Sequence, residues 1–122
     1  MANLTLQLTI PASGVGNLAN ALPVPTGGSG PLTATVVGNL YVQWLTIQNN
    51  AAHNIRYGLD NKVSVTTPAA VNGGTAGRGI LLAAGSPGGA GSQSTPVTYS
   101  TYLSDWWIAG TAGDVIDILA LQ

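Results

Sequence analysis

The C-terminal segment from Trp106 to Leu121 limits the fold more than any other stretch of this chain. It is densely apolar, and it holds two of the three tryptophans and two of the four acidic residues. We predict a β-hairpin here, with a strand over 106–109, a turn over 110–113 and a return strand over 114–121. The turn contains two glycines, which supply the positive φ values that tight hairpins need.

The return strand of this hairpin is apolar on both faces. Alternation places one set of side chains on one face and a second set on the other: Val115, Asp117, Leu119 and Leu121 against Ile116, Ile118 and Ala120. A strand that is apolar on both faces is typical of a position covered on both sides. We therefore expect this strand to lie at the centre of the core.

Other segments alternate in the same way. Leu4, Leu6, Leu8 and Ile10 face one side of a half-buried strand that ends at Pro11. The remaining expected strands cover 32–37, 40–48, 55–57, 62–67, 80–84 and 97–103. About eight strands with turn residues between them predict an all-β fold, a single antiparallel β-sandwich, with a jelly-roll-like arrangement as one form of it.

Residues 11–31 contain four prolines and five glycines, which rule out a long regular element. We expect residues 1–31 to form an N-terminal strand followed by a Pro/Gly-rich extended arm, and residues 32–122 to form the sandwich domain. The sequence leaves two alternatives for the first strand. It either completes the sheet of its own domain or reaches a neighbouring subunit through Leu4, Leu6 and Leu8.

Charge is scarce, because only 6% of the residues are Asp, Glu, Lys or Arg, against roughly 25% in an average soluble domain. The full set is Arg56, Lys62, Arg78, Asp60, Asp105, Asp114 and Asp117. Few charges make a poor surface for a free monomer. We expect partners to cover much of the surface; the alternative is a surface kept soluble by Ser, Thr, Asn and Gln.

Several classes of function conflict with this composition. Three basic residues cannot neutralise a nucleic-acid backbone. No apolar run approaches the ~20 residues of a transmembrane helix, and the N-terminus lacks the features of a signal peptide. The chain has no cysteine, and hence no disulfide or thiolate metal site. We therefore expect no nucleic-acid partner, no membrane partner and synthesis in the cytosol.

No arrangement of residues predicts catalysis. His53 is the single histidine and lies in a polar turn, whereas a metal site needs several ligands and a hydrolytic triad needs a nearby nucleophile and acid. The glycine-rich loops lack the patterns that cradle phosphate. We therefore predict a protein that is not an enzyme and has no catalytic, cofactor-binding or metal-binding residues.

Asp117 is unusual because it shares a strand face with Val115 and Leu119. A buried carboxylate is costly unless it is paired. One hypothesis is that Asp117 pairs with Arg56 or Arg78, inside the subunit or across an interface. The alternative is that this face is open to water near the edge of the sheet.

Trp106 and Trp107 are adjacent, so on a strand they face opposite sides. Three interpretations remain open. Both can pack in the core, one can anchor an interface, since tryptophan is enriched at binding hot spots, or one can form a platform on which a sugar stacks.

Five short motifs occur in an order that resembles small virion structural proteins of tailed bacteriophages. They are a strand ending in Gln-Asn, an Ile-Arg-Tyr-Gly strand, a Val-Ser-Val-Thr-Thr strand, a Gly-x-x-Leu-x-Ala-Gly turn and a closing Gly-Thr-Ala-Gly-Asp hairpin, within 45–49, 54–58, 63–67, 79–85 and 107–115. The resemblance covers residues 45–115 in pieces. The chain departs from the pattern in its longer glycine-rich loops and its N-terminal arm.

The resemblance implies a β-sandwich that coats or joins parts of a virion, and it brings no catalytic residues. We expect a capsid decoration (cement) protein that binds the major capsid protein or other virion proteins and stabilises the head shell. Symmetric self-association, with a trimer favoured, would cover apolar surface. The alternative is a tail- or fibre-associated module that recognises a host glycan through exposed aromatic side chains.

Overall fold

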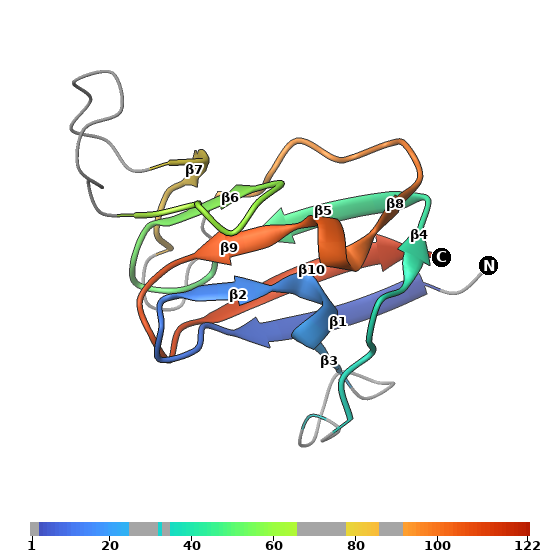
Figure 1. Cartoon of the computed structure of the whole chain (residues 1–122), viewed down its shortest axis with the longest axis horizontal. Helices are drawn as coiled ribbons and strands as arrows, with labels where there is room; N and C mark the ends of the chain where they lie inside the picture. The colour runs from blue at the N-terminus through green and yellow to red at the C-terminus, as the bar shows by residue number, and fades with distance from the viewer. Residues whose placement is uncertain (1–2, 25–31, 33–34, 66–77, 86–91) are drawn as a thin grey trace.

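The computed structural model describes residues 3–24, 32, 35–65, 78–85 and 92–122 (Figure 1). Strands and two short 3₁₀ turns make up its regular structure, in the following order. They are β1 (Asn3–Thr9), β2 (Val15–Asn17), η1 (Leu18–Asn20), β3 (Leu22–Pro23), β4 (Tyr41–Val42), β5 (Trp44–Gln48), β6 (Ile55–Gly58), β7 (Ile80–Leu82), β8 (Thr101–Tyr102), η2 (Leu103–Asp105), β9 (Trp107–Ala109) and β10 (Val115–Leu121). The prediction of an all-β fold is confirmed. Within the described residues, no helix is long and apolar enough to cross a membrane.

Two four-stranded sheets stack on each other, and a separate pair, β4 and β8, lies near the C-terminus (Figure 1). The first sheet has the order β3-β1-β10-β5, and the second has the order β2-β9-β6-β7. All strand pairs are antiparallel. Residues 92–97 extend the first sheet beyond β5, because Val97 exchanges backbone hydrogen bonds with Leu45 at 2.8 and 3.0 Å.

Among the described residues, the chain crosses between the two sheets at residues 10–14, 49–54 and 110–114, and η1 returns it from β2 to β3. The strands joined by these crossings have the same order in the two sheets. In the first sheet β10 lies between β1 and β5, and in the second β9 lies between β2 and β6. With 92–97 beside β5 and β7 beside β6, each layer contains the strands of an eight-stranded jelly roll in the corresponding order. The sandwich is therefore of the jelly-roll kind.

The predicted C-terminal hairpin is wrong. β9 and β10 lie in different sheets, and the connection between them pairs with the crossing at residues 10–14 instead. Gly110 N–H donates to the Gly14 carbonyl at 2.9 Å, and Gly113 N–H donates to the Ile10 carbonyl at 2.9 Å. Gly110 is needed for close approach, since a Cβ there would lie 3.1 Å from Cγ2 of Ile55. Only Gly113, with φ of 90°, has the turn conformation that the prediction assumed.

The N-terminal strand belongs to its own sandwich. All seven residues of β1 pair with β10, and β3 pairs with the other edge of β1. Leu6 and Leu8 are buried in the core, so the alternative in which they reach a neighbouring subunit is wrong, and Leu4 is partly buried against the same core. Residues 3–24 are thus part of the two sheets rather than an arm outside them, and residues 25–31 of the predicted arm lie outside the described residues.

Some of the other predicted strands are present in altered form, and others are not strands in the described residues. The segment 40–48 is divided at Gln43 into β4 and β5, and 97–103 contains only β8 as a strand. The described residues of 32–37 form no strand, and β2 and β3 occur where none was predicted. Parts of the predicted strands over 32–37 and 62–67, and of the glycine-rich loops, lie outside the described residues.

The core lies between the two sheets. Its largest fully buried side chains come from both layers: Leu6, Ile10, Leu18, Val42, Leu45, Ile47, Ile55, Leu103, Ile108, Ile116 and Ile118. The alternation of β10 directs Ile116, Ile118 and Ala120 into this core. The other face of β10 remains partly open, because Val115 and Leu119 are each 39% exposed. The prediction that both faces of this strand are buried is therefore wrong within one chain.

Candidate interaction surfaces

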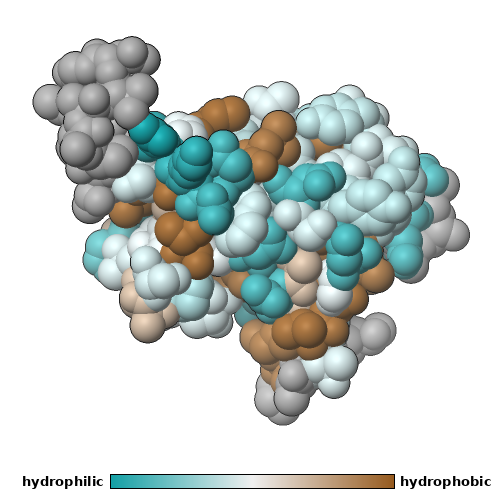
Figure 2. Space-filling view, viewed as in Figure 1, coloured by the Kyte–Doolittle hydropathy of each residue, from teal (hydrophilic) through white to brown (hydrophobic). Residues whose placement is uncertain are grey.

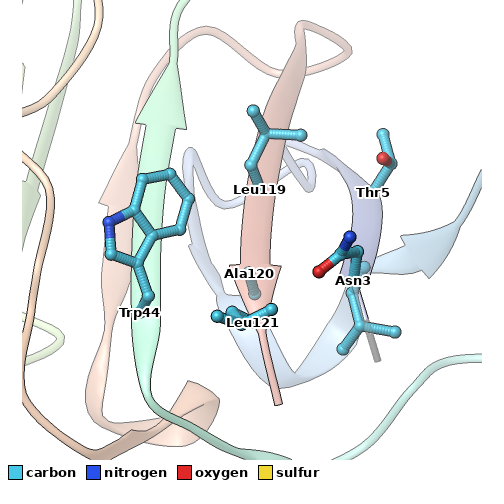
Figure 3. Close-up of a pocket in the computed structure, with 7 residues that line it drawn as sticks. Asn3, Thr5, Trp44, Leu119, Ala120 and Leu121 are labelled. Atoms are coloured by element: carbon cyan, nitrogen blue, oxygen red, sulfur yellow. The ribbon is translucent and has the colours of Figure 1, made fainter. Parts of the chain in front are cut away.

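An apolar groove lies on the outward face of the β3-β1-β10-β5 sheet (Figure 3). Its volume is 320 Å³, and its lining consists of Asn3, Leu4, Thr5, Trp44, Leu119, Ala120 and Leu121. We call it the Trp44 groove. No lining residue carries a charged side chain, so the groove suits an uncharged and largely apolar group.

Strand register builds the Trp44 groove. Trp44 on β5 stands opposite Leu121 on β10, and Leu119 stands opposite Thr5 on β1. Figure 3 shows these side chains extending from three neighbouring strands on one side of the sheet. Thr46, the next outward residue on β5, is buried beneath residues 92–97 and shares a 3.2 Å hydrogen bond with the Ser94 hydroxyl. The groove is therefore a part of this face that no other described segment covers.

Asp117 lies on the same outward face, and its carboxylate is held by two amides. Gln7 Nε2 donates to Oδ1 at 2.7 Å, and Asn50 Nδ2 donates to Oδ2. These bonds replace part of the hydration that the half-buried carboxylate loses. The amides satisfy the carboxylate without removing its negative charge.

The predicted ion pair of Asp117 with Arg56 or Arg78 does not form within the chain. Arg56 lies on β6 of the opposite sheet, and its Nη1 donates to the Gly79 carbonyl at 2.8 Å. Arg78 precedes β7 in the same opposite layer, where its backbone pairs with Ser64. The core separates these arginines from Asp117, so only a pairing across an interface remains from that hypothesis.

Polar contacts fix the crossings at one end of the sandwich. His53 Nδ1 lies 2.9 Å from Oδ2 of Asp114, which joins the 49–54 crossing to the 110–114 crossing. Asn49 is fully buried, and its Nδ2 donates to the carbonyls of His53 and Leu82 at 2.9 and 3.0 Å. Sequence reasoning missed Asn49, whose only signal is an amide at the end of an apolar strand. These contacts join the 49–54 crossing to the 110–114 crossing and to β7.

The two adjacent tryptophans have different environments. Trp106 is 6% exposed and packs against Tyr57, with a ring-centroid distance of 6.2 Å. Its indole Nε1 donates to Thr101 Oγ1 at 3.1 Å. Trp107 is half-buried on β9 and stands beside Asn17 and Gly58 in the register. Trp106 is therefore a core residue that no partner or sugar can reach, whereas Trp107 retains some exposed surface.

A tyrosine pair forms an aromatic surface that sequence reasoning did not identify as a site. Tyr41 on β4 and Tyr102 on β8 are register partners, with ring centroids 4.8 Å apart and planes tilted by 54°. They are 52% and 46% exposed. Each falls within a predicted strand, but their sequence positions do not reveal that these two strands pair.

Neither a cluster of metal ligands nor a similar known protein assigns a role to these surfaces. Among the described residues, no three His, Asp, Glu or Cys side chains gather in a group that could hold a metal ion. Comparison of the chain with protein-family models, with curated proteins and with solved structures finds no match.

Proposed function

We propose that this chain is a non-enzymatic structural protein of a bacteriophage particle, and that it decorates and stabilises the head shell. The observation that carries the proposal is the outward face of β10. Leu119 and the Trp44 groove present apolar surface at the middle of a sheet, where burial of each large side chain is worth about 1.5–3 kcal/mol. A contact with the major capsid protein or another virion protein would cover that surface.

Two further features support this proposal. The jelly roll is an architecture shared by viral capsid proteins and lectins, although a fold alone does not assign a function. The surface also carries little charge, with 6% charged residues in the chain, which favours contact over repulsion between closely packed subunits. The resemblance of residues 45–115 to small virion proteins agrees with both features.

Rebinding to head shells tests this function. Purified chain is mixed with phage heads stripped of their outer proteins, and the pellet is assayed after sedimentation. We expect saturable binding of the wild-type chain and weaker binding of Leu119→Arg, which places a charge in the Trp44 groove. Thr98→Arg is the matched control, because Thr98 is exposed outside the groove. Absence of wild-type binding to any stripped shell would contradict the proposal.

The second candidate is a tail- or fibre-associated module that binds a host glycan. The exposed pair of Tyr41 and Tyr102 favours it, because tyrosine rings combine an apolar face with a hydroxyl that can bond a sugar. Glycan binding that is lost in both Tyr41→Ala and Tyr102→Ala, but retained in Tyr99→Ala, would support this role. Tyr99 is a suitable control because it is also exposed, at 57%.

A further inference from the structure

The seven charged residues all lie in the described part of the chain, and the three bases gather at one layer while Asp117 lies on the other. The three bases belong to the β6–β7 side of the second sheet: Arg56 in β6, Lys62 in the following turn and Arg78 just before β7. Two acids also adjoin this sheet: Asp60 in the turn after β6, and Asp105 in η2 before β9. The first sheet carries Asp117 in β10 and Asp114 at its start, and none of its strands contains a base.

The side chains of Arg56 and Asp117 face outward from opposite sides of the sandwich. Arg56 lies between Ile55 and Tyr57, which are buried in the core, so its side chain faces outward from the second sheet. Asp117 lies between Ile116 and Ile118, which are also buried, so it faces outward from the first sheet. Packed sheets are about 10 Å apart, and the filled core between them keeps the two groups from meeting in one chain.

Each of these charges stands beside exposed apolar surface. Leu119 and the Trp44 groove adjoin Asp117 on the first sheet. Leu81, which is 47% exposed, is the register partner of Arg56 on the second sheet. Figure 2 shows apolar residues at the surface near β6 and β7 with hydrophilic residues beside them. Each outer face therefore combines apolar area with a charged group, which is Asp117 on the first sheet and Arg56 on the second.

We propose that copies of this chain associate head to tail, with the acidic outer face of the first sheet docked on the basic outer face of β6 and β7 in the next copy. Asp117 then faces Arg56 of the neighbouring copy, and Leu119 packs against its Leu81. Such a contact is heterologous, so it closes into a ring or continues as a filament. A two-fold contact of the acidic face with itself would bring like charges together, which disfavours it.

This inference rests on the proposed function and deepens it, because it names a second copy of the chain as one partner of the sheet face that holds the Trp44 groove. Its test needs no phage particle. Association in solution without binding to stripped shells would support the inference and contradict the shell-binding role. A chain that stays monomeric in solution yet binds stripped shells would contradict the inference and support the shell-binding role.

Charge exchange between the two faces provides the test. Sedimentation velocity of the full chain is measured over a range of concentrations, at low and high salt. We expect reversible oligomers that weaken with salt, because screening acts on the charge pairs. Asp117→Arg and Arg56→Asp should each raise the dissociation constant by about tenfold or more. The double variant carrying both changes should associate again, since its two faces are once more opposite in sign.

The double variant separates the two possible symmetries. In a head-to-tail contact it restores attraction, whereas in a two-fold contact of the acidic face it leaves two basic faces opposed. Arg56→Asp keeps the amide bonds of Asp117 intact, so it tests the contact even if Asp117→Arg unfolds the chain. A wild-type monomer at all concentrations, an unaltered dissociation constant in Arg56→Asp, or a double variant that folds but stays dissociated would overturn the proposal.

Discussion

The indole Nε1 of Trp106 donates a 3.1 Å hydrogen bond to Oγ1 of Thr101, five residues earlier in the chain. Thr101 Oγ1 in turn lies 3.2 Å from Oδ2 of Asp105, which also accepts from the Tyr102 N–H. This local network holds η2 and lets a large aromatic ring enter the core without an unpaired N–H. It explains how the chain accommodates two adjacent tryptophans with only one of them in the core.

Removal of the Thr101 hydroxyl tests this network. We expect Thr101→Val to lower the free energy of unfolding by about 1–3 kcal/mol, because the buried indole N–H loses its acceptor while the side-chain volume is kept. Urea denaturation measures the change. Thr98→Val is the matched control, since Thr98 is exposed, and it should shift the midpoint little. Equal stability of the two variants would contradict the role given to Thr101.

Asn49 should be the most sensitive polar residue at the crossing end of the sandwich. Asn49→Ala leaves the carbonyls of His53, Leu82 and Ala83 without its amide and the Ala51 N–H without its acceptor. We expect a loss of about 1–3 kcal/mol or more in unfolding free energy. Asn61→Ala, in the exposed turn after β6, should cost under about 0.5 kcal/mol. Chemical denaturation of both proteins distinguishes them.

The burial of Tyr57 predicts that the folded chain loses stability at alkaline pH. Burial raises the pKa of Tyr57 above its ordinary value of 10.0, because desolvation disfavours the phenolate. Above that ordinary value the unfolded chain loses this proton more readily than the folded chain. Stability is therefore fully present below pH 10.0 and falls as the pH rises toward the folded-state pKa.

Substitution of the phenol isolates this effect. In Tyr57→Phe, thermal unfolding followed from neutral to alkaline pH should show a shallower decline above the ordinary tyrosine pKa than in the wild type. Tyr99→Phe, at a position that is 57% exposed, serves as the control and should follow the wild-type curve. A Tyr57→Phe curve that also matches the wild type would show that Tyr57 does not drive the alkaline loss.

The alternation of polar and apolar residues predicted where several strands lie, but not how they pair. The strand at 4–10 and the strand at 114–121 were placed well, because each has one face in the core. The hairpin was wrong because turn glycines occur equally at connections that switch sheets. Here the choice depends on the distant contact of Gly110 with Gly14, which no local pattern encodes.

The same limit applies to the surfaces. The sequence identified Asp117 as anomalous on an apolar face, and the structure places it on a face that one chain leaves partly open. Its amide partners, Gln7 and Asn50, are 110 and 67 residues away, so only the fold brings them together. Trp44 lines the groove, because the outward direction of its side chain depends on which sheet face the remaining strands cover.

Imaging at subunit resolution of a phage particle that contains this chain tests the account most directly. We predict density for the sandwich on the outside of the head shell, with the Trp44 groove and Asp117 covered by a neighbouring protein. A particle in which the chain is present but this face of the first sheet is open to solvent would contradict the account.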